Sequence, residues 1–301
     1  MGDLEFAERP QLNRTILIAA FSGWSDASES ATRAVEYLAR EYGARKFAWI
    51  DSEDFFDFTS LRPTVAMRGG RGRVINWPTN EFLYASAQES GRDLLFLSGV
   101  EPHLHWRKFA SLFVEVAEAA QVELVITLGG LLDAVPHTRP ARVIATATSE
   151  TLGEGFEQVH LPASRYEGPT GIISVVLDLM TRKGVPCVSL WGRAPHYLQV
   201  KPNPQVTLAL LRQLQTFLPV PLNLQGLGKA SDEFLSGLGR ALEGQQQIVE
   251  HIKQLEEKYD RETPGELSVP QTPSETQALI SDLEQFLRQR HGEGDGESNR
   301  G

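Results

Sequence analysis

Short apolar segments alternate with amphipathic helical segments along most of the chain, and this alternation constrains the fold more than any other feature. The apolar runs have the length of strands, and helix-type spacing of apolar residues follows most of them. Strands are predicted at 15–21, 47–50, 93–97, 124–128, 142–146 and 187–191. Helices are predicted after Asp26 and near 106–120, 171–183 and 204–218. Such a pattern is typical of an α/β protein with parallel strands.

Charge and composition exclude several classes of protein. The 29 Lys and Arg against 39 Asp and Glu give a net charge of −10, which disfavours nucleic acid as a partner. Apolar runs such as 15–21 are much shorter than the ~20 residues of a membrane-spanning helix, and the acidic N-terminus is unlike a signal peptide. The single cysteine, Cys187, lies in an apolar run and is expected to be a buried thiol. These features predict a cytoplasmic protein that contacts neither nucleic acid nor a membrane.

Between the second and third predicted strands, the pattern changes to that of an antiparallel insertion at a sheet edge. Two β-type runs flank a turn centred on Gly69 and Gly70. The turn carries Arg68, Arg71 and Arg73. These arginines could clamp an acidic partner or a phosphate, or they could simply keep a protruding hairpin in solution and protect its edge.

After residue 224 the strand signals stop and the chain becomes helical. Apolar residues between Phe234 and Tyr259 recur at spacings of four and three, typical of a short coiled coil or helical hairpin, and equally of a helix that docks on a partner. We therefore divide the chain into an α/β domain at 1–224 and a coiled-coil-like helical extension at 225–261. The predicted remainder is a proline-rich linker at 262–274, a short amphipathic helix at 275–290 and a disordered tail at 291–301.

The usual motifs of nucleotide binding and serine hydrolysis are missing from the sequence. It contains no G-x-x-x-x-G-K-[ST], G-x-G-x-x-G or G-x-S-x-G, so no cofactor is predicted. Glycine-bearing loops at 22–26, 129–130 and 167–171 are expected at the carboxyl ends of the strands, where open α/β sheets bind ligands. Alternatively, these glycines only permit tight turns. The carboxylate of Asp26, which is expected to cap the following helix, would repel an anion at the start of that helix.

Two clusters could in principle hold a metal ion, but neither favours one. Acidic residues occur at Asp51, Glu53, Asp54 and Asp57, where interleaved phenylalanines favour a solvated loop with aromatic anchors. The histidines at 103, 105 and 137 do not form a strong zinc pattern, so no metal site is predicted. The aromatic residues Trp24, Trp77, Trp106 and Tyr197 fall in loops or at element ends. They are candidate interface anchors, or alternatively lids over the core.

Several segments together carry a family resemblance that spans almost the whole chain. They are GWSDAS at 23–28, LGGLL at 128–132, VPHTRP at 135–140, EGPTGI at 167–172, WGRAPHYL at 191–198 and the PNP-led helix at 202–218. With these segments the chain resembles the proteasome assembly chaperone family of the second-chaperone type, and in particular its actinobacterial branch. The resemblance implies a three-layer αβα fold similar to nucleoside phosphorylases and peptidyl-tRNA hydrolases, in a homo-oligomer.

The resemblance also implies partners. Eukaryotic relatives scaffold the ring of proteasome α subunits, and archaeal relatives can engage the proteasome through a C-terminal hydrophobic-tyrosine-any motif. The residues at 298–301, SNRG, depart from that motif, so we expect no such insertion of the tail. Some relatives carry a carboxylate–amine ligase label, but the sequence contains no ATP-binding loop to support it.

The sequence thus favours a non-enzymatic protein that binds protein partners, including proteasome α subunits. The alternative is an enzyme or small-ligand sensor with a phosphorylase-like pocket, in which Asp26, His137, Arg139 and His196 converge on a substrate. This alternative rests mainly on analogy of fold. The candidate ligand-binding or partner-binding residues are Gly23, Trp24, Asp26, Gly129, Gly130, His137, Arg139, Gly168, Gly171, His196 and Tyr197.

Overall fold

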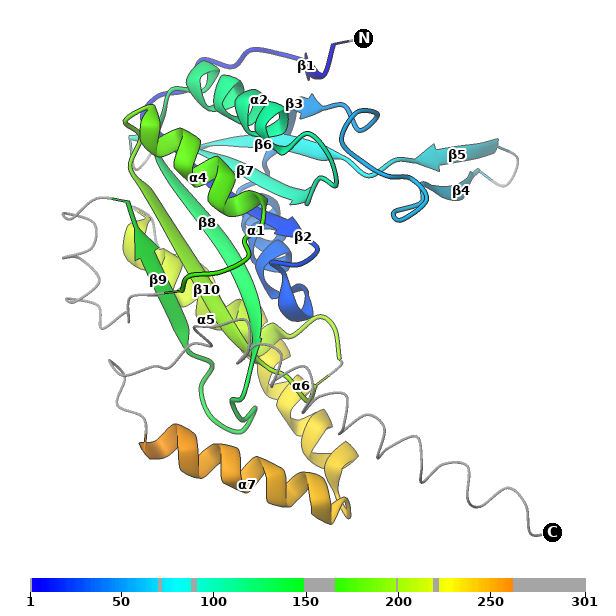
Figure 1. Ribbon diagram of the computed structural model, residues 1–301, viewed down its shortest axis with the longest axis vertical. Helices are drawn as coiled ribbons and strands as arrows, with labels where there is room; N and C mark the ends of the chain where they lie inside the picture. Colours follow the sequence, from blue (N-terminus) through cyan, green and yellow to red (C-terminus); the bar gives the residue numbers. More distant parts are fainter. Residues whose placement is uncertain are drawn as a thin grey trace.

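The structure is a computed structural model that describes residues 2–69, 72–87, 91–148, 166–198, 200–218 and 222–261. Within these residues, a sheet of eight strands carries helices on both faces (Figure 1). Its strands are β1 (Leu4–Phe6), β2 (Thr15–Ser22), β3 (Arg45–Ile50), β6 (Asn80–Ala87), β7 (Arg92–Val100), β8 (Val122–Asp133), β9 (Val143–Ala147) and β10 (Cys187–Pro195). The helices that pack on it are α1 (Ser30–Glu41), α2 (Trp106–Ala119), α4 (Ile172–Arg182) and α5 (Pro204–Leu214).

The strand order is β1-β3-β6-β7-β2-β8-β10-β9. The four central strands, β7, β2, β8 and β10, run parallel to one another. The strands outside them pair in antiparallel fashion at both edges. The parallel strands expected from the sequence therefore form the centre of a mixed sheet. β3 follows α1 in the chain, but two strands, β6 and β7, lie between it and β2.

The layers follow from burial on both faces of the central strands. In β2, Leu17 and Phe21 belong to the core beneath α2 and α4, whereas Ile16 and Ile18 belong to the core beneath α1 and α5. A strand that is buried on both faces has a nearly continuous apolar sequence. The apolar run from which β2 was predicted has this property. The expected three-layer αβα sandwich is confirmed. Cys187 at the start of β10 is buried, and burial raises the pKa of its thiol to about 11.

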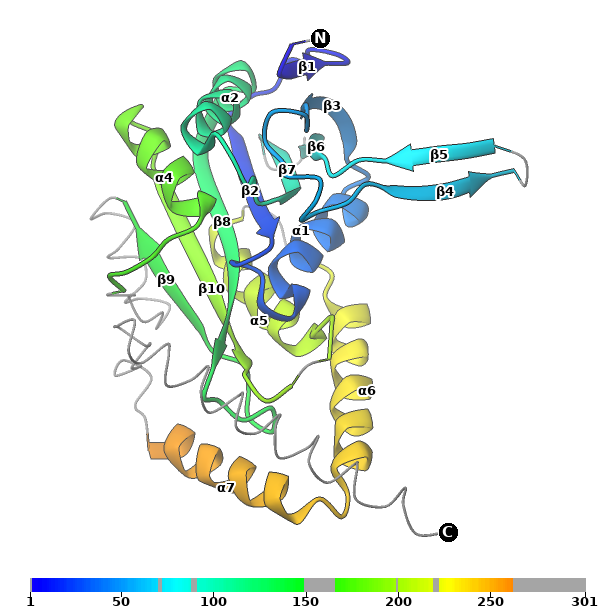
Figure 2. The same cartoon turned by 45° about the vertical axis from the view of Figure 1, so that its right-hand side comes forward.

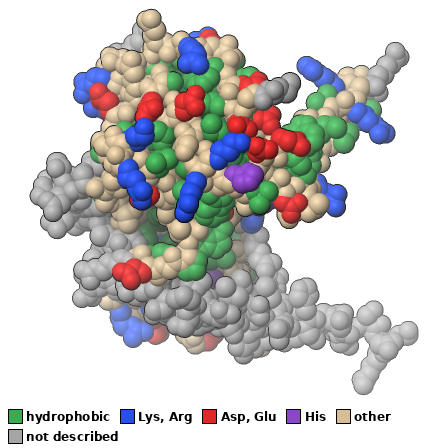
Figure 3. All heavy atoms as spheres, turned by 45° about the horizontal axis from the view of Figure 1, so that its top comes forward, with side chains coloured by type: hydrophobic (Ala, Val, Ile, Leu, Met, Phe, Trp, Pro, Cys, Tyr) green, Lys and Arg blue, Asp and Glu red, His purple; other side chains and the backbone are tan. Residues whose placement is uncertain are grey.

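Two strands form a separate hairpin. β4 (Thr64–Arg68) and β5 (Gly72–Asn76) pair in antiparallel register and project away from the core (Figure 2). The surface view shows apolar and basic side chains on this hairpin (Figure 3). The antiparallel insertion predicted from the sequence is thus present, but the following strand, β6, enters the main sheet between β3 and β7.

The helical extension consists of α6 (Gln225–Leu242) and α7 (Gln246–Arg261), which are separated at Gly244 with φ of 83°. α6 contacts α5, and α7 crosses below the sheet (Figure 1). The apolar seam predicted in this segment docks on the chain's own α/β domain. Ile248, Ile252 and Leu255 of α7 pack in one cluster with Tyr197. No helix in the described ranges is long and apolar enough to cross a membrane. The linker, short helix and tail predicted at 262–301 lie outside the described residues.

Candidate functional site

Two loops meet at the carboxyl ends of the parallel strands β2 and β7. Ser22 and Val100 are partners at the ends of these strands, and the Glu101 backbone N–H donates a hydrogen bond to the Ser22 carbonyl at 3.0 Å. The residues that follow, Gly23 and Trp24 after β2 and Glu101 after β7, therefore lie together at the edge of the sheet where α/β proteins bind ligands.

The Glu101 carboxylate links three segments at this edge. Its Oε2 accepts a hydrogen bond from the Trp24 backbone N–H at 3.4 Å, and its Oε1 accepts one from the Ile172 backbone N–H at 2.9 Å. Ile172 is the first residue of α4, so Glu101 occupies the helix N-terminus at which an anion would bind. A Cβ at position 171 would lie 2.6 Å from Oε1 of Glu101, so a larger residue there would displace this carboxylate.

The Asp26 carboxylate occupies the beginning of α1 in a similar way. It is buried and accepts hydrogen bonds from the backbone N–H groups of Ala31 at 2.8 Å and Thr32 at 3.3 Å, and from the Thr32 hydroxyl. Burial raises the pKa of Asp26, and the hydrogen bonds from Thr32 and Ala31 oppose that shift. The sequence predicted that Asp26 opens the helix directly. Instead a short 3-10 turn, Ala27–Glu29, intervenes, and α1 begins at Ser30.

Gly23, Trp24, Glu101 and Gly171 define what we call the carboxyl-edge surface. Trp24 projects from it with 60% of its surface exposed. Gly23 has a φ of 121°, a conformation that favours glycine, and it lets the loop turn against Glu101. The surface therefore offers an exposed indole on a loop that is held by hydrogen bonds. Its helix N–H groups at Ile172 and at the start of α1 are already satisfied by the protein's own carboxylates.

The other candidate glycines allow close packing rather than turns. A Cβ at Gly129 would lie 2.5 Å from the Trp191 ring. At Gly130 it would lie 2.7 Å from the Ser30 hydroxyl, and at Gly168 it would lie 2.5 Å from the Tyr166 hydroxyl oxygen. Each glycine is thus explained by a neighbour within this chain.

A second group of candidate residues lies under α7. Tyr197 is only 4% exposed, and its hydroxyl accepts a hydrogen bond from the His137 backbone N–H at 2.8 Å. The same hydroxyl lies 2.7 Å from Nδ1 of His137. The Tyr197 ring packs edge-on against His196 and against His251 of α7, with ring centroids 5.7 and 5.9 Å apart. Burial lowers the pKa of His137, while nearby Glu256 opposes that shift. Tyr197, proposed from the sequence as a candidate anchor, can meet a partner only if α7 moves away.

Arg139 also binds side chains of α7. Its Nε and Nη2 donate to the two oxygens of Asp260 at 2.9 and 2.7 Å, and Nη1 donates to Glu256 at 3.1 Å. These carboxylates, Asp260 above all, raise the pKa of Arg139. Arg142 adds a cation–π contact, with its guanidinium carbon 3.5 Å from the centre of the Tyr259 ring. We call these residues, with His137, His196 and Tyr197, the α7 interface.

The residues that were expected to converge on a substrate make two sets of contacts. Asp26 directs its carboxylate to the first residues of α1, beside the Gly130 bridge. His137, Arg139 and His196 instead gather beneath α7, where they contact that helix or the Tyr197 ring. The phosphorylase-like pocket predicted as an alternative would need all four residues around one substrate.

The acidic cluster after β3 makes contacts within its own loop and with α2. Asp54 pairs with Lys108 at 2.8 Å. Asp57 accepts hydrogen bonds from Thr59 and Ser60, and these lower its pKa to about 2. In the part of the chain that the structure describes, no three His, Cys, Asp or Glu side chains are arranged to hold a metal ion.

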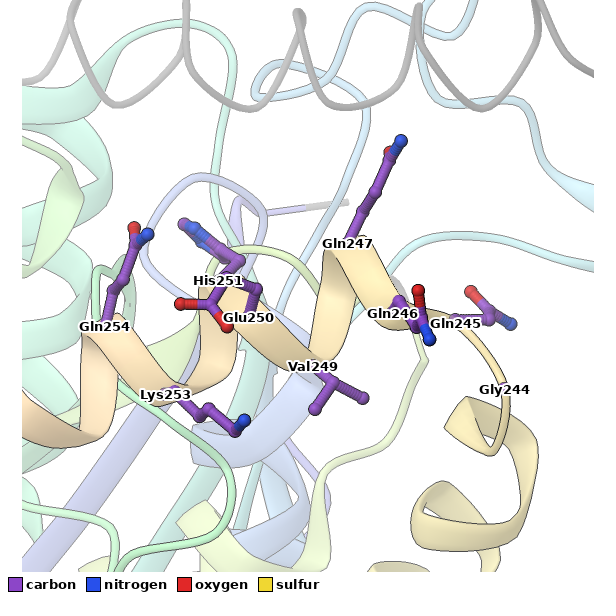
Figure 4. A pocket seen from close by; sticks show the side chains of 9 residues that line it. All are labelled: Gly244, Gln245, Gln246, Gln247, Val249, Glu250, His251, Lys253 and Gln254. Carbon is purple, nitrogen blue, oxygen red and sulfur yellow. The ribbon is translucent and has the colours of Figure 1, made fainter.

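A groove of about 1090 Å³ runs along the first turns of α7 (Figure 4). Among the residues that the structure describes, those that line it lie between Gly244 and Gln254, and most are polar. None of them belongs to the carboxyl-edge surface.

Comparison with known proteins identifies the family. The model of the PAC2 family matches residues 20–241. The chain belongs to the PAC2 family. A PAC2 family protein of Streptomyces avermitilis shares 38% sequence identity and superposes with a TM-score of 0.73, covering 79% of this chain and 99% of that one. A proteasome-assembly chaperone homologue of Mycobacterium tuberculosis is 33% identical in sequence and superposes with a TM-score of 0.72. The match covers 79% of this chain and 99% of that one. The resemblance found in the sequence is confirmed.

A more distant relative extends the fold to archaea. The Pyrococcus furiosus proteasome activator PbaB is 21% identical to this PAC2-family chain and has a TM-score of 0.62, over 80% of this chain and 98% of that one. At this identity the similarity shows a shared fold. No protein with a curated description matches the chain in sequence.

Sequence reasoning missed Glu101 as a residue of the site. Its role depends on a contact with Ile172, 71 residues further along the chain, which no local pattern reports. The one available signal was an acidic residue four positions after the strand predicted at 93–97 and directly before Pro102.

Proposed function

We propose that this PAC2-family protein is a non-enzymatic, chaperone-like binding protein of the cytoplasm that engages protein partners through the carboxyl-edge surface. One observation carries the proposal: Trp24 is 60% exposed at an edge where both helix N-termini are already occupied by Asp26 and Glu101. Tryptophan is enriched among the residues that dominate the binding energy of protein interfaces. Because the loop around it is hydrogen-bonded to Glu101, little loop entropy is lost when a partner binds.

The same geometry disfavours a small anionic substrate. Phosphate or carboxylate groups bind helix N-termini through backbone N–H groups that lack other partners. Here the N–H groups of Ala31 and Ile172 donate to Asp26 and Glu101. An incoming anion would have to displace a carboxylate or approach its negative charge.

Proteasome α subunits are the proposed partner. Support comes from the Mycobacterium tuberculosis relative, which is described as a proteasome-assembly chaperone homologue and is 33% identical to this chain. The archaeal relative PbaB is described as a proteasome activator. The homo-oligomeric state that the sequence resemblance implied is part of the same proposal.

The test measures binding of the full-length protein to purified proteasome α subunits, for the wild type, Trp24→Ala and Trp77→Ala. We expect Trp24→Ala to weaken binding by at least about tenfold, as the loss of an interface anchor does. Trp77 is an exposed tryptophan, 44% exposed, at the base of the β4–β5 hairpin and serves as the matched control. Its replacement should leave the affinity unchanged.

Failure of the wild type to bind α subunits would contradict the proposed partner. Equal binding by the wild type and Trp24→Ala would contradict the proposed surface. The alternative function is tested in parallel by thermal unfolding with nucleosides, inorganic phosphate and simple carboxylates, because a ligand that binds the folded state raises its apparent stability. A reproducible shift with one of these compounds would favour the ligand-binding alternative.

A further inference from the structure

The carboxyl-edge surface places an aromatic ring beside a carboxylate. A Cβ built on Gly171 would lie 2.6 Å from Oε1 of Glu101 and 3.5 Å from Cε3 of Trp24. Cε3 belongs to the six-membered ring of the indole, so this ring and the carboxylate border the same small space beside Gly171. Trp24 is 60% exposed, and Glu101 is partly exposed. A partner that docks on this surface therefore meets both groups together.

Glycines on two sides keep side chains away from the Glu101 carboxylate. Gly171 faces Oε1, and a Cβ at Gly23 would lie 3.4 Å from Oε2. The carboxylate is held by the backbone N–H groups of Trp24 at 3.4 Å and Ile172 at 2.9 Å. An ionised carboxylate accepts about four hydrogen bonds, so it retains capacity for a further donor. Within the residues that the structure describes, no lysine or arginine forms an ion pair with Glu101.

The charge of the surrounding loops suits a cation. The loop after β2, the loop between β7 and α2 and the loop before α4 contain three carboxylates and no lysine or arginine, at 23–26, 101–105 and 166–171. Two of these carboxylates, Glu101 and Glu167, are at least partly exposed, and the third is buried. A basic segment of a partner is therefore complementary in charge to this edge of the sheet.

An arginine side chain fits both the ring and the carboxylate. Its planar guanidinium stacks on aromatic rings, among which tryptophan attracts cations most strongly. Its forked N–H groups also match the two oxygens of a carboxylate. An apolar side chain would cover the Trp24 ring but would bury the Glu101 charge without a partner, which is unfavourable. Because the two groups are neighbours, one guanidinium can contact both.

We propose that the carboxyl-edge surface recognises its protein partner through an arginine side chain, which stacks on the Trp24 ring and pairs with the Glu101 carboxylate. This inference rests on the proposed function, because it names the chemistry by which the same surface selects a partner. A partner with a neutral or acidic side chain at this point would leave Glu101 unpaired or repel it. The carboxylate therefore acts against the wrong partners as well as for the right one.

The first experiment replaces the partner by a simple probe, a tri-arginine peptide with blocked ends. The full-length protein is labelled with fluorotryptophan, and Trp24→Phe identifies the fluorine signal of Trp24. We expect this signal to shift as the peptide is added, while the signal of the exposed Trp77 stays in place. A matching tri-citrulline peptide, which has the same shape without the charge, should bind at least about tenfold more weakly.

Two variants test whether the Glu101 charge is responsible. Glu101→Gln keeps an oxygen that can accept the Ile172 N–H, and it should reduce the affinity for the arginine peptide to that for the citrulline peptide. The matched control, Glu41→Gln, removes an exposed carboxylate at the far end of α1 and should leave the affinity unchanged. A Trp24 signal that does not move, equal binding of the two peptides, or an equal loss in both variants would overturn the proposal.

The second experiment measures binding of the full-length protein to purified proteasome α subunits. Trp24→Phe keeps an aromatic face, whereas Trp24→Leu keeps only an apolar side chain. Trp24→Leu and Glu101→Gln should each bind at least about fivefold more weakly than Trp24→Phe, and added salt should weaken the wild type more than Glu101→Gln. An apolar anchor without a cation would give equal affinities for Trp24→Leu and Trp24→Phe.

The two experiments separate the arginine contact from the proposed function. Binding of α subunits that Trp24→Ala weakens but Trp24→Leu and Glu101→Gln leave intact would support the proposed function and overturn the arginine contact. Binding of the arginine peptide at Trp24 without capture of α subunits would support the arginine contact and contradict the proposed partner.

Discussion

The β4–β5 hairpin and helix α7 are both appended to the same αβα core, but their apolar side chains lie in opposite environments. In α7, Ile252 is 7% exposed and packs with Tyr197. In the hairpin, Ile75 is 53% exposed. Both segments have apolar residues at regular spacing, so the spacing alone does not decide burial. What decides it is whether the same chain also supplies a complementary surface.

The α7 interface shows what such a surface requires. Tyr197 provides an apolar ring, and its hydroxyl is satisfied by the His137 backbone N–H. Around this centre, Arg139 and Arg142 bind side chains and a ring near the end of α7. The family match ends at residue 241, before α7 begins, so these contacts hold a helix that lies beyond the matched region. The hairpin has no equivalent set of contacts in the described residues except at its base, where Trp77 meets Phe58.

Removal of the ring at the centre of the α7 interface should have the largest effect. Tyr197→Ala leaves a cavity beneath α7 and removes the acceptor of the His137 backbone N–H. We expect a loss of about 3–5 kcal/mol in the free energy of unfolding, measured with urea. Tyr197→Phe keeps the ring and should lose only about 1–2 kcal/mol. If both variants are as stable as the wild type, α7 does not dock on Tyr197 in solution.

A matched pair of substitutions sharpens the comparison between the two appendages. Ile252→Ala in α7 removes buried methyl groups and should lower the free energy of unfolding by about 2 kcal/mol. Ile75→Ala in the hairpin removes the same groups from an exposed site and should change it by less than about 0.5 kcal/mol. Unfolding is measured at a low protein concentration, so that self-association does not contribute. A large loss for Ile75→Ala would show that the hairpin is covered even in the monomer.

The core could be predicted from the sequence because its pattern is local. The run that forms β2 is apolar at nearly every position, which is what burial between two helical layers requires. The pair Asn203 and Pro204 predicted the start of α5, and the Asn203 side chain indeed accepts hydrogen bonds from Gln205 and Val206. Strand order was not accessible in this way, because β6 and β7 separate β2 from β3 through pairings between distant segments.

The candidate site was less predictable for the same reason. Trp24 and Gly23 were found, because glycine and tryptophan are conspicuous in a loop after a strand. Glu101 was missed, since its importance comes from Ile172 in another part of the chain. Tyr197 was found as a candidate, but the sequence did not show that α7 covers it. Periodicity reports which face of a helix is apolar and says nothing about which surface receives that face.

The smallest expected effect is a pH dependence of α7 docking, which the β4–β5 hairpin should not show. Burial places the pKa of His137 below its ordinary value of 6.5, with Glu256 in opposition. His196 and His251 surround the same Tyr197 ring. A histidine with a lowered pKa contributes stability above the pKa of the undocked state, because the docked state takes up the proton less readily than the undocked state. That contribution is lost as the pH falls below about 6.5.

Hydrogen exchange of the α7 amides should therefore show less protection at about pH 5.5 than at about pH 7.5, after correction for the intrinsic rates. The hairpin contains no histidine, so the exchange of its amides should follow the intrinsic rates alone. His137→Gln should reduce the pH dependence of α7, whereas His105→Gln, at an exposed position outside the α7 interface, should preserve it. If His137→Gln leaves the pH dependence intact, burial of His137 is not its cause. If α7 protection does not change with pH at all, burial of His137 does not couple to docking, and the helix is held by its apolar contacts and by Arg139.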